Sequence, residues 1–198
     1  MTRIMMEQVP PAVIGTTFVF LLNLSYYLPL LDARTMAWWA TGIWAMTLAR
    51  VGLVLAYRTM RQARRHVSWV TLLGMISLGH GCVWGAALAN AVMRLPPLES
   101  ELLLVSVAGI SGAAVGTSCA SLITFSAFAL PIAIALPLAG WFTGQSAGVH
   151  LMLLWIAYFA ILFLVARSFS RLLRRHVLAN IQNEELIARL QELSVRDS

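Results

Sequence analysis

Six long apolar runs constrain the fold of this 198-residue chain more than any other feature. They cover residues 10–31, 37–57, 69–93, 102–120, 122–143 and 149–167. Each is close to the roughly 20 residues that a helix needs to cross a bilayer. Backbone groups in hydrocarbon must be hydrogen-bonded within the segment, so such runs form helices. None alternates as a barrel strand does. We therefore predict an all-α membrane protein with six transmembrane helices.

Composition supports this prediction. With 60% hydrophobic and 11% charged residues, the chain lacks the polar side chains that would cover a soluble globule. The first run is too long for a secretory signal and has no cleavage site after it. The fourth and fifth runs are separated only by a small polar stretch, residues 117–121. We interpret it as a turn, because about 42 residues in one helix would span two bilayers.

Arginine placement predicts the topology. The chain has no lysine, and its arginines gather after the second and sixth runs. These two groups are Arg58, Arg61, Arg64 and Arg65, and Arg167, Arg171, Arg174 and Arg175. Only Arg34 and Arg94 fall in the opposite connections. The positive-inside rule then places both termini in the cytoplasm of a bacterial inner membrane. Topology alone accounts for the net charge of +6, so we predict no nucleic-acid partner.

Apolar residues continue past the sixth run with a 3.5-residue period. This period predicts that the last helix continues as a parallel coiled coil of a homodimer. We expect a transmembrane domain, 1–167, followed by a signalling helix, 168–198. The seam runs from Leu162 through Val165, Phe169, Leu172, His176, Ala179, Asn183, Leu186, Leu190 and Leu193. A buried Asn183 would fix the register of two strands. The alternative is an amphipathic helix on the membrane surface.

The end of this helix resembles a known linker. Leu190, Leu193, Ser194 and Asp197 match the Leu-x-x-Leu-(Ser/Ala)-x-x-Asp run that feeds a GGDEF domain, the catalytic domain of diguanylate cyclases. The resemblance implies a membrane sensor that controls the pairing of two cyclase domains, which make cyclic di-GMP from GTP. This chain carries no catalytic residues of that domain. A histidine kinase is the alternative output, but Val177 follows His176 where such kinases have an acidic residue.

Polar groups inside the predicted spans are candidate ligand-binding residues, because the bilayer makes them costly. Arg50 lies about two turns inward from Arg58. It could extend toward the cytoplasmic surface, or meet an anionic headgroup or carboxylate. Ser77, His80 and Trp84 share one helical face. His80 beside Trp84 could bind a ligand, sense protons or hold a metal; the alternative is a histidine hydrogen-bonded to another helix. Asn23 also needs a partner. The expected ligand is a lipophilic molecule entering from the membrane lipid. A small transporter, with Arg50, His80 and Asn23 along its path, is the alternative function.

Two further features leave alternatives open. No cofactor is predicted; a haem between His80 and His150 is the sharpest alternative, but His150 should lie at a different depth. The fourth run carries a stripe of small residues, Gly109, Gly112 and Gly116. Such a stripe permits close helix approach, as a dimer face, as packing within one bundle or as the wall of a pocket. Cys82 and Cys119 are not expected to form a disulfide.

Overall fold

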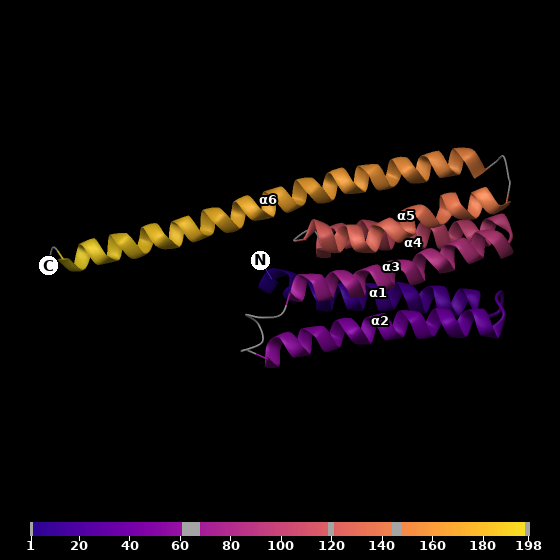
Figure 1. The fold of residues 1–198 in the computed structure, drawn as a ribbon, viewed down its shortest axis with the longest axis horizontal. Coiled ribbons are helices and arrows are strands. Elements are labelled where there is room, and N and C mark those ends of the chain that lie inside the picture. The colour runs from indigo at the N-terminus through magenta and orange to yellow at the C-terminus, as the bar shows by residue number, and fades with distance from the viewer. Residues whose placement is uncertain (1, 61–67, 119–120, 144–147, 197–198) are drawn as a thin grey trace.

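The chain folds into a bundle of six helices, seen here in a computed structural model (Figure 1). It describes residues 2–60, 68–118, 121–143 and 148–196. Within these ranges, six helices are long and apolar enough to cross a membrane, which confirms the predicted all-helical, multi-span architecture. The helices are α1 (Thr2–Tyr27), α2 (Ala33–Thr59), α3 (Trp69–Arg94), α4 (Pro97–Ser118), α5 (Leu122–Thr143) and α6 (Gly148–Arg196).

Helix boundaries follow the sequence closely except in α1. The first span was predicted at 10–31, whereas α1 starts at Thr2 and ends at Tyr27. Its first turns join the bundle because Met5, Met6 and Val9 are buried against α2 and α3. The predicted turn between the fourth and fifth spans is confirmed, since α4 ends at Ser118 and α5 begins at Leu122. Cys119 lies outside the described residues.

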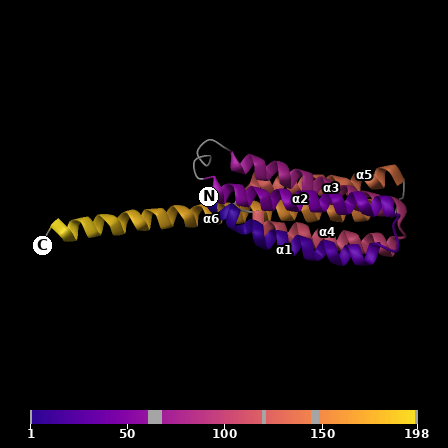
Figure 2. The ribbon, with the colours of Figure 1, turned by 90° about the horizontal axis from the view of Figure 1, so that it is seen from below.

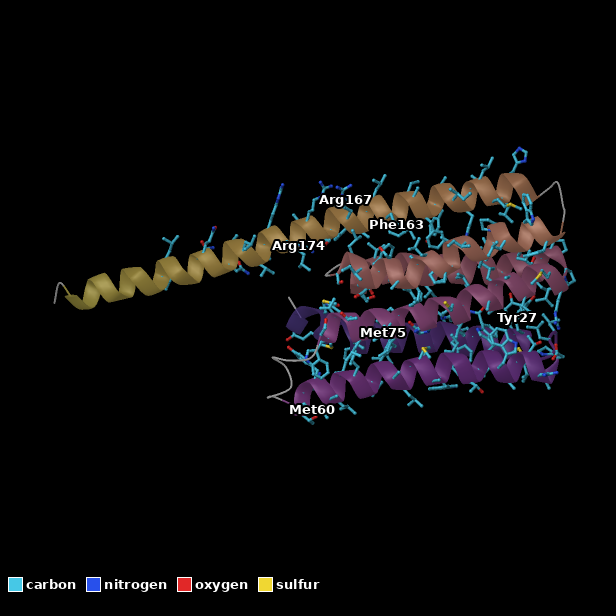
Figure 3. All side chains as sticks on the ribbon, in the orientation of Figure 1. Tyr27, Met60, Met75, Phe163, Arg167 and Arg174 are labelled. Carbon is cyan, nitrogen blue, oxygen red and sulfur yellow. The ribbon has the colours of Figure 1, made fainter. Side chains whose placement is uncertain are left out.

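One end of the bundle holds the start of the chain, the end of α2, the start of α3 and the exit of α6 (Figures 1 and 2). Figure 3 places Met60 at this end, with Arg167 and Arg174 where α6 leaves the bundle, and Tyr27 at the opposite end. Arg58, in the last turn of α2, therefore lies at the same end as Arg167 and Arg174, whereas Arg61, Arg64 and Arg65 lie outside the described residues. This is the arrangement that an even number of spans requires.

The opposite end is held by contacts between its connections. Asp32 caps α2, where its Oδ1 accepts a hydrogen bond of 2.8 Å from the backbone N–H of Thr35. Its Oδ2 lies 3.4 Å from Nη1 of Arg94, at the end of α3. The Tyr27 hydroxyl donates to the backbone carbonyl of Glu99 at the start of α4. These contacts hold the start of α2 and the end of α1 in place.

The bundle exposes many large apolar side chains and buries several polar ones. Ile14, Leu48, Val105 and Ile123 are each at least 65% exposed, as expected of helices that face lipid. The interior contains two apolar clusters. The larger cluster surrounds Trp39, Trp84 and Phe125, and the smaller one surrounds Met5, Leu53 and Trp69. Between the residues that α2 and α3 contribute to these two clusters lie buried polar residues, among them Arg50 and Ser77.

The closest helix approach joins α3 to α5. A Cβ atom added at Gly81 would fall within 3 Å of the backbone carbonyl oxygen of Phe128. One added at Gly85 would lie 2.9 Å from the carbonyl oxygen of Pro131. Only glycine permits this spacing. Gly81 and Gly85 thus form the small-residue pair that brings two helix backbones together, a role the sequence analysis considered only for the fourth run.

Helix α6 is a single helix of 49 residues that continues past the bundle (Figure 1). It remains in contact with the other helices as far as Leu173, which packs against the smaller apolar cluster. Beyond this point Leu178, Asn183 and Leu186 are exposed. The continuous helix agrees with the prediction, and the coiled coil itself remains a prediction.

Candidate functional site

The buried guanidinium of Arg50 is the centre of the candidate site. Arg50 is 8% exposed, and its position on α2 falls between the two apolar clusters. Its Nη2 donates a long hydrogen bond of 3.4 Å to Oγ of Ser77 on α3. The ring centroid of Phe128 on α5 lies 6.0 Å from its Cζ, at the limit of a cation–π contact. Among the described residues, no carboxylate forms an ion pair with Arg50.

A cavity of about 160 Å³ lies beside this guanidinium, and we call it the Arg50 cavity. Four helices build it, and most of its wall is apolar. Its wall includes Ala12, Gly15 and Thr16 of α1, Gly109 and Ala113 of α4, and Phe128 of α5. Gly15, Gly109 and Ala113 are exposed at the bundle surface, whereas Arg50 and Phe128 are buried. The cavity therefore runs from the outer surface of α1 and α4 inward to the charge.

Hydroxyl groups gather near Arg50. A second, smaller cavity of about 20 Å³ also contacts Arg50 and is lined by Ser77, Thr117, Ser118 and Thr124. The Oγ1 atom of Thr124 is buried and has no hydrogen-bond partner in the part of the chain that the structure describes, and the same is true of Nε of Arg50. Unsatisfied donors inside a protein are costly and call for an acceptor. The described site thus has spare donors and a net positive charge.

His80 belongs to the same buried region. It follows Ser77 by one turn on α3 and is 1% exposed. Its ring packs edge-on against Phe128, with centroids 5.9 Å apart, so both His80 and Arg50 contact the same phenyl ring. Within the described residues, neither ring nitrogen of His80 has a hydrogen-bond partner. Three of the five candidate ligand-binding residues, Arg50, Ser77 and His80, thus lie in one buried region, and ligand binding by them stays a prediction.

The other two predicted ligand-binding residues lie elsewhere. Trp84 packs in an aromatic cluster, with ring centroids 5.6 Å from Trp39 and 6.5 Å from Phe20. Asn23 is buried, and its Nδ2 donates to the backbone carbonyl of Val19 in its own helix at 2.8 Å. Neither lines the two cavities at Arg50. Trp84 shares a helical face with Ser77 and His80, but a shared face does not determine which residues line a cavity.

The small-residue stripe of α4 serves two surfaces. Gly109 lines the Arg50 cavity, and an added Cβ there would meet no heavy atom within 4 Å. Gly112 faces α6, where an added Cβ would lie 3.4 Å from the hydroxyl of Tyr158. The predicted pocket wall is therefore found at Gly109. A dimer face on this stripe stays a prediction.

The described residues contain no group of three or more His, Cys, Asp or Glu side chains arranged to hold a metal ion. His80 is buried within α3, whereas His150 is exposed at the start of α6. Cys82 is a free, exposed cysteine. A haem held by these two histidines remains untested. One ring is buried and the other is exposed, so the two do not line a common pocket.

Sequence reasoning missed much of the cavity wall. Gly15, Thr124 and Phe128 were not singled out, because small, hydroxyl and aromatic side chains are common in membrane helices. The small polar stretch between the fourth and fifth runs, residues 117–121, was interpreted only as a turn, although Thr117 and Ser118 line the cavity. Comparisons with family models, curated proteins and solved structures find no match to this chain.

Proposed function

We propose that this chain is the sensor and transducer of a signalling protein in the bacterial inner membrane. A lipophilic signal changes the packing of the bundle, and α6 carries that change to paired output domains in the cytoplasm. The observation that carries this proposal is the continuity of α6 from Gly148 to Arg196, inside and beyond the bundle. An unbroken helix transmits a shift or rotation along its length.

A hydrogen bond links α6 to the wall of the Arg50 cavity. The hydroxyl of Tyr158 donates to the backbone carbonyl of Ala108 at 2.5 Å, and Gly109, which follows, lines the cavity. Nε1 of Trp155 donates to the carbonyl of Ile132 on α5 at 3.4 Å. A ligand that displaces α4 would therefore act on α6 through Tyr158, while Trp155 holds α6 against α5.

The exposed seam supports a dimer. Phe169, Leu172 and Leu186 are 50%, 65% and 57% exposed in the single chain. Beyond the membrane an exposed apolar row is unfavourable, and a second copy offers the matching row. His176 and Asn183 on the same seam are also exposed. The opposed rows would bury these side chains and bring two output domains together.

The output that we propose is a diguanylate cyclase. The support is the resemblance of Leu190, Leu193, Ser194 and Asp197 to the linker of GGDEF proteins. That reaction joins two GTP molecules held in two half-sites, so its rate depends on how two domains face each other. The role of this chain is to set that pairing, and the chemistry belongs to the cyclase domain.

A chimera tests the proposal. The chain is fused after Ser198 to a GGDEF domain that is active only as a dimer, and cyclic di-GMP is measured in cells. Leu186→Glu places a charge in the seam and should lower cyclic di-GMP at least about tenfold, because burying a leucine contributes about 1.5–3 kcal/mol. Leu178→Glu is the matched control, since Leu178 is 60% exposed and lies off the seam. Equal output from both variants would overturn the proposal.

A further inference from the structure

The uncompensated charge of Arg50 and the cavity beside it carry one inference about the signal. We propose that the Arg50 cavity binds a free fatty acid, with the carboxylate on Arg50 and the acyl chain leaving between α1 and α4. This inference depends on the proposed function only for its biological meaning. Binding at Arg50 is measurable on the chain alone, without any output domain.

The first argument is charge. A buried cation without a counter-ion is unfavourable, and inside a bilayer the cost is larger. Among the described residues, Arg50 has one long hydrogen bond, to Ser77, and its Nε has no partner. A carboxylate neutralises a guanidinium and accepts two parallel hydrogen bonds from it. The unpartnered hydroxyl of Thr124, which lines the adjoining cavity with Arg50, is a further donor.

The second argument is size. The Arg50 cavity measures about 160 Å³, and cavities of about 150 Å³ hold a molecule as large as benzene. That volume accommodates a carboxylate and the first few methylene groups. A phospholipid would have to place a phosphate and a glycerol with two acyl chains in the same space. The volume of the cavity therefore favours a carboxylate with a single acyl chain over a phospholipid.

The third argument is the path of the chain. The outer rim of the cavity is formed by Gly15 on α1 and by Gly109 and Ala113 on α4. These residues have little or no side chain, so the two helices leave room for an acyl chain between them. Outside this rim the bundle exposes apolar residues, among them Ile14 and Val105. The acyl chain would thus pass directly into lipid.

The test measures equilibrium binding of radiolabelled oleate to the purified chain in nanodiscs made of a zwitterionic phospholipid. Competitors are unlabelled oleate, methyl oleate, which has the same chain and no charge, and the anionic phospholipid dioleoylphosphatidylglycerol. Two variants probe the site. Arg50→Gln removes the charge. Gly109→Leu fills the cavity at a position where an added Cβ meets no atom within 4 Å. Gly52→Leu is the control, because Gly52 is equally open and lines neither cavity at Arg50.

We expect unlabelled oleate to compete at least about tenfold better than methyl oleate, because a hydrogen-bonded charge pair is lost with the ester. Arg50→Gln and Gly109→Leu should each weaken oleate binding at least about tenfold, and Gly52→Leu should not. Gly109→Leu decides the matter if Arg50→Gln fails to fold. Equal competition by methyl oleate, unchanged binding by Gly109→Leu, or stronger competition by the phospholipid would each overturn the proposal. If oleate binding fails these tests while Leu186→Glu still lowers cyclic di-GMP in the chimera, the proposed function stands without the fatty acid.

Discussion

Nη2 of Arg50 and Oγ of Ser77 lie 3.4 Å apart inside the bundle, joined by a hydrogen bond from α2 to α3. The two residues are 27 positions apart in the chain, and each lies between apolar positions of its own helix. The bond therefore aligns the polar positions of two neighbouring helices at one depth. Arg50 also lines the Arg50 cavity and its smaller neighbour, and its Nε has no hydrogen-bond partner among the described residues.

Ser77→Ala should destabilise the bundle by about 0.5–1.5 kcal/mol, because it removes the hydrogen-bond partner of a buried charge. The midpoint of unfolding in a denaturing detergent measures this change. Ser106→Ala serves as control, since the Ser106 hydroxyl is exposed and bonds only the Leu102 carbonyl of its own helix. Equal midpoints for the two variants would contradict the role of Ser77.

Gly81→Ala should destabilise the protein by about 1–3 kcal/mol, because the added methyl group meets the Phe128 carbonyl and separates α3 from α5. Gly74→Ala on the same helix has open space and should be neutral or stabilising, since alanine has the higher helix propensity. Thermal unfolding of both variants gives the comparison. A stable Gly81→Ala would mean that the two backbones are further apart.

Asp32 should make stability pH-dependent. The Thr35 hydroxyl, which donates to its carboxylate, is the main cause that holds the pKa of Asp32 below its usual 3.8; the Thr35 backbone N–H adds to this. A lowered folded-state pKa means that the stabilisation is complete above the unfolded-state pKa and is lost as pH falls through the folded-state pKa. Melting temperatures from about pH 6 down to about pH 2 test this.

The control for that experiment is Asp32→Asn. Asparagine keeps a side-chain oxygen that can cap α2 but does not titrate in this range. Its melting temperature should fall less steeply below about pH 4 than that of the unaltered chain. Parallel curves for the two proteins would assign the acid sensitivity to other groups.

Tyr158→Phe should uncouple the cavity from α6 in the cyclase chimera. It removes the hydroxyl that bonds the Ala108 carbonyl and keeps the ring in place. We expect the oleate-dependent change in cyclic di-GMP to be lost, while oleate binding stays within about twofold, because one hydrogen bond is removed and Tyr158 itself does not line the Arg50 cavity. Tyr26→Phe, at a 42% exposed position of α1, is the control. A retained response would place the coupling at another contact.

The number, order and rough limits of the helices were predictable because they depend on local properties. A run of apolar residues must form a helix in lipid, whatever its neighbours are. The turn before Leu122 follows from the length of one span, and the continuity of α6 follows from the 3.5-residue period of its apolar residues. The early start of α1 did not follow, since the burial of Met5 and Met6 depends on α2 and α3.

Residue identity also determined which polar groups were costly, so Arg50, Ser77 and His80 could be named from the sequence. Only the tertiary structure decided which of them meet, because helices in lipid pack through shape and small residues rather than through a hydrophobic pattern. Gly81 rather than Gly109 makes the close approach, which brings Phe128 against both Arg50 and His80. Gly109 is left lining a cavity that four helices form together.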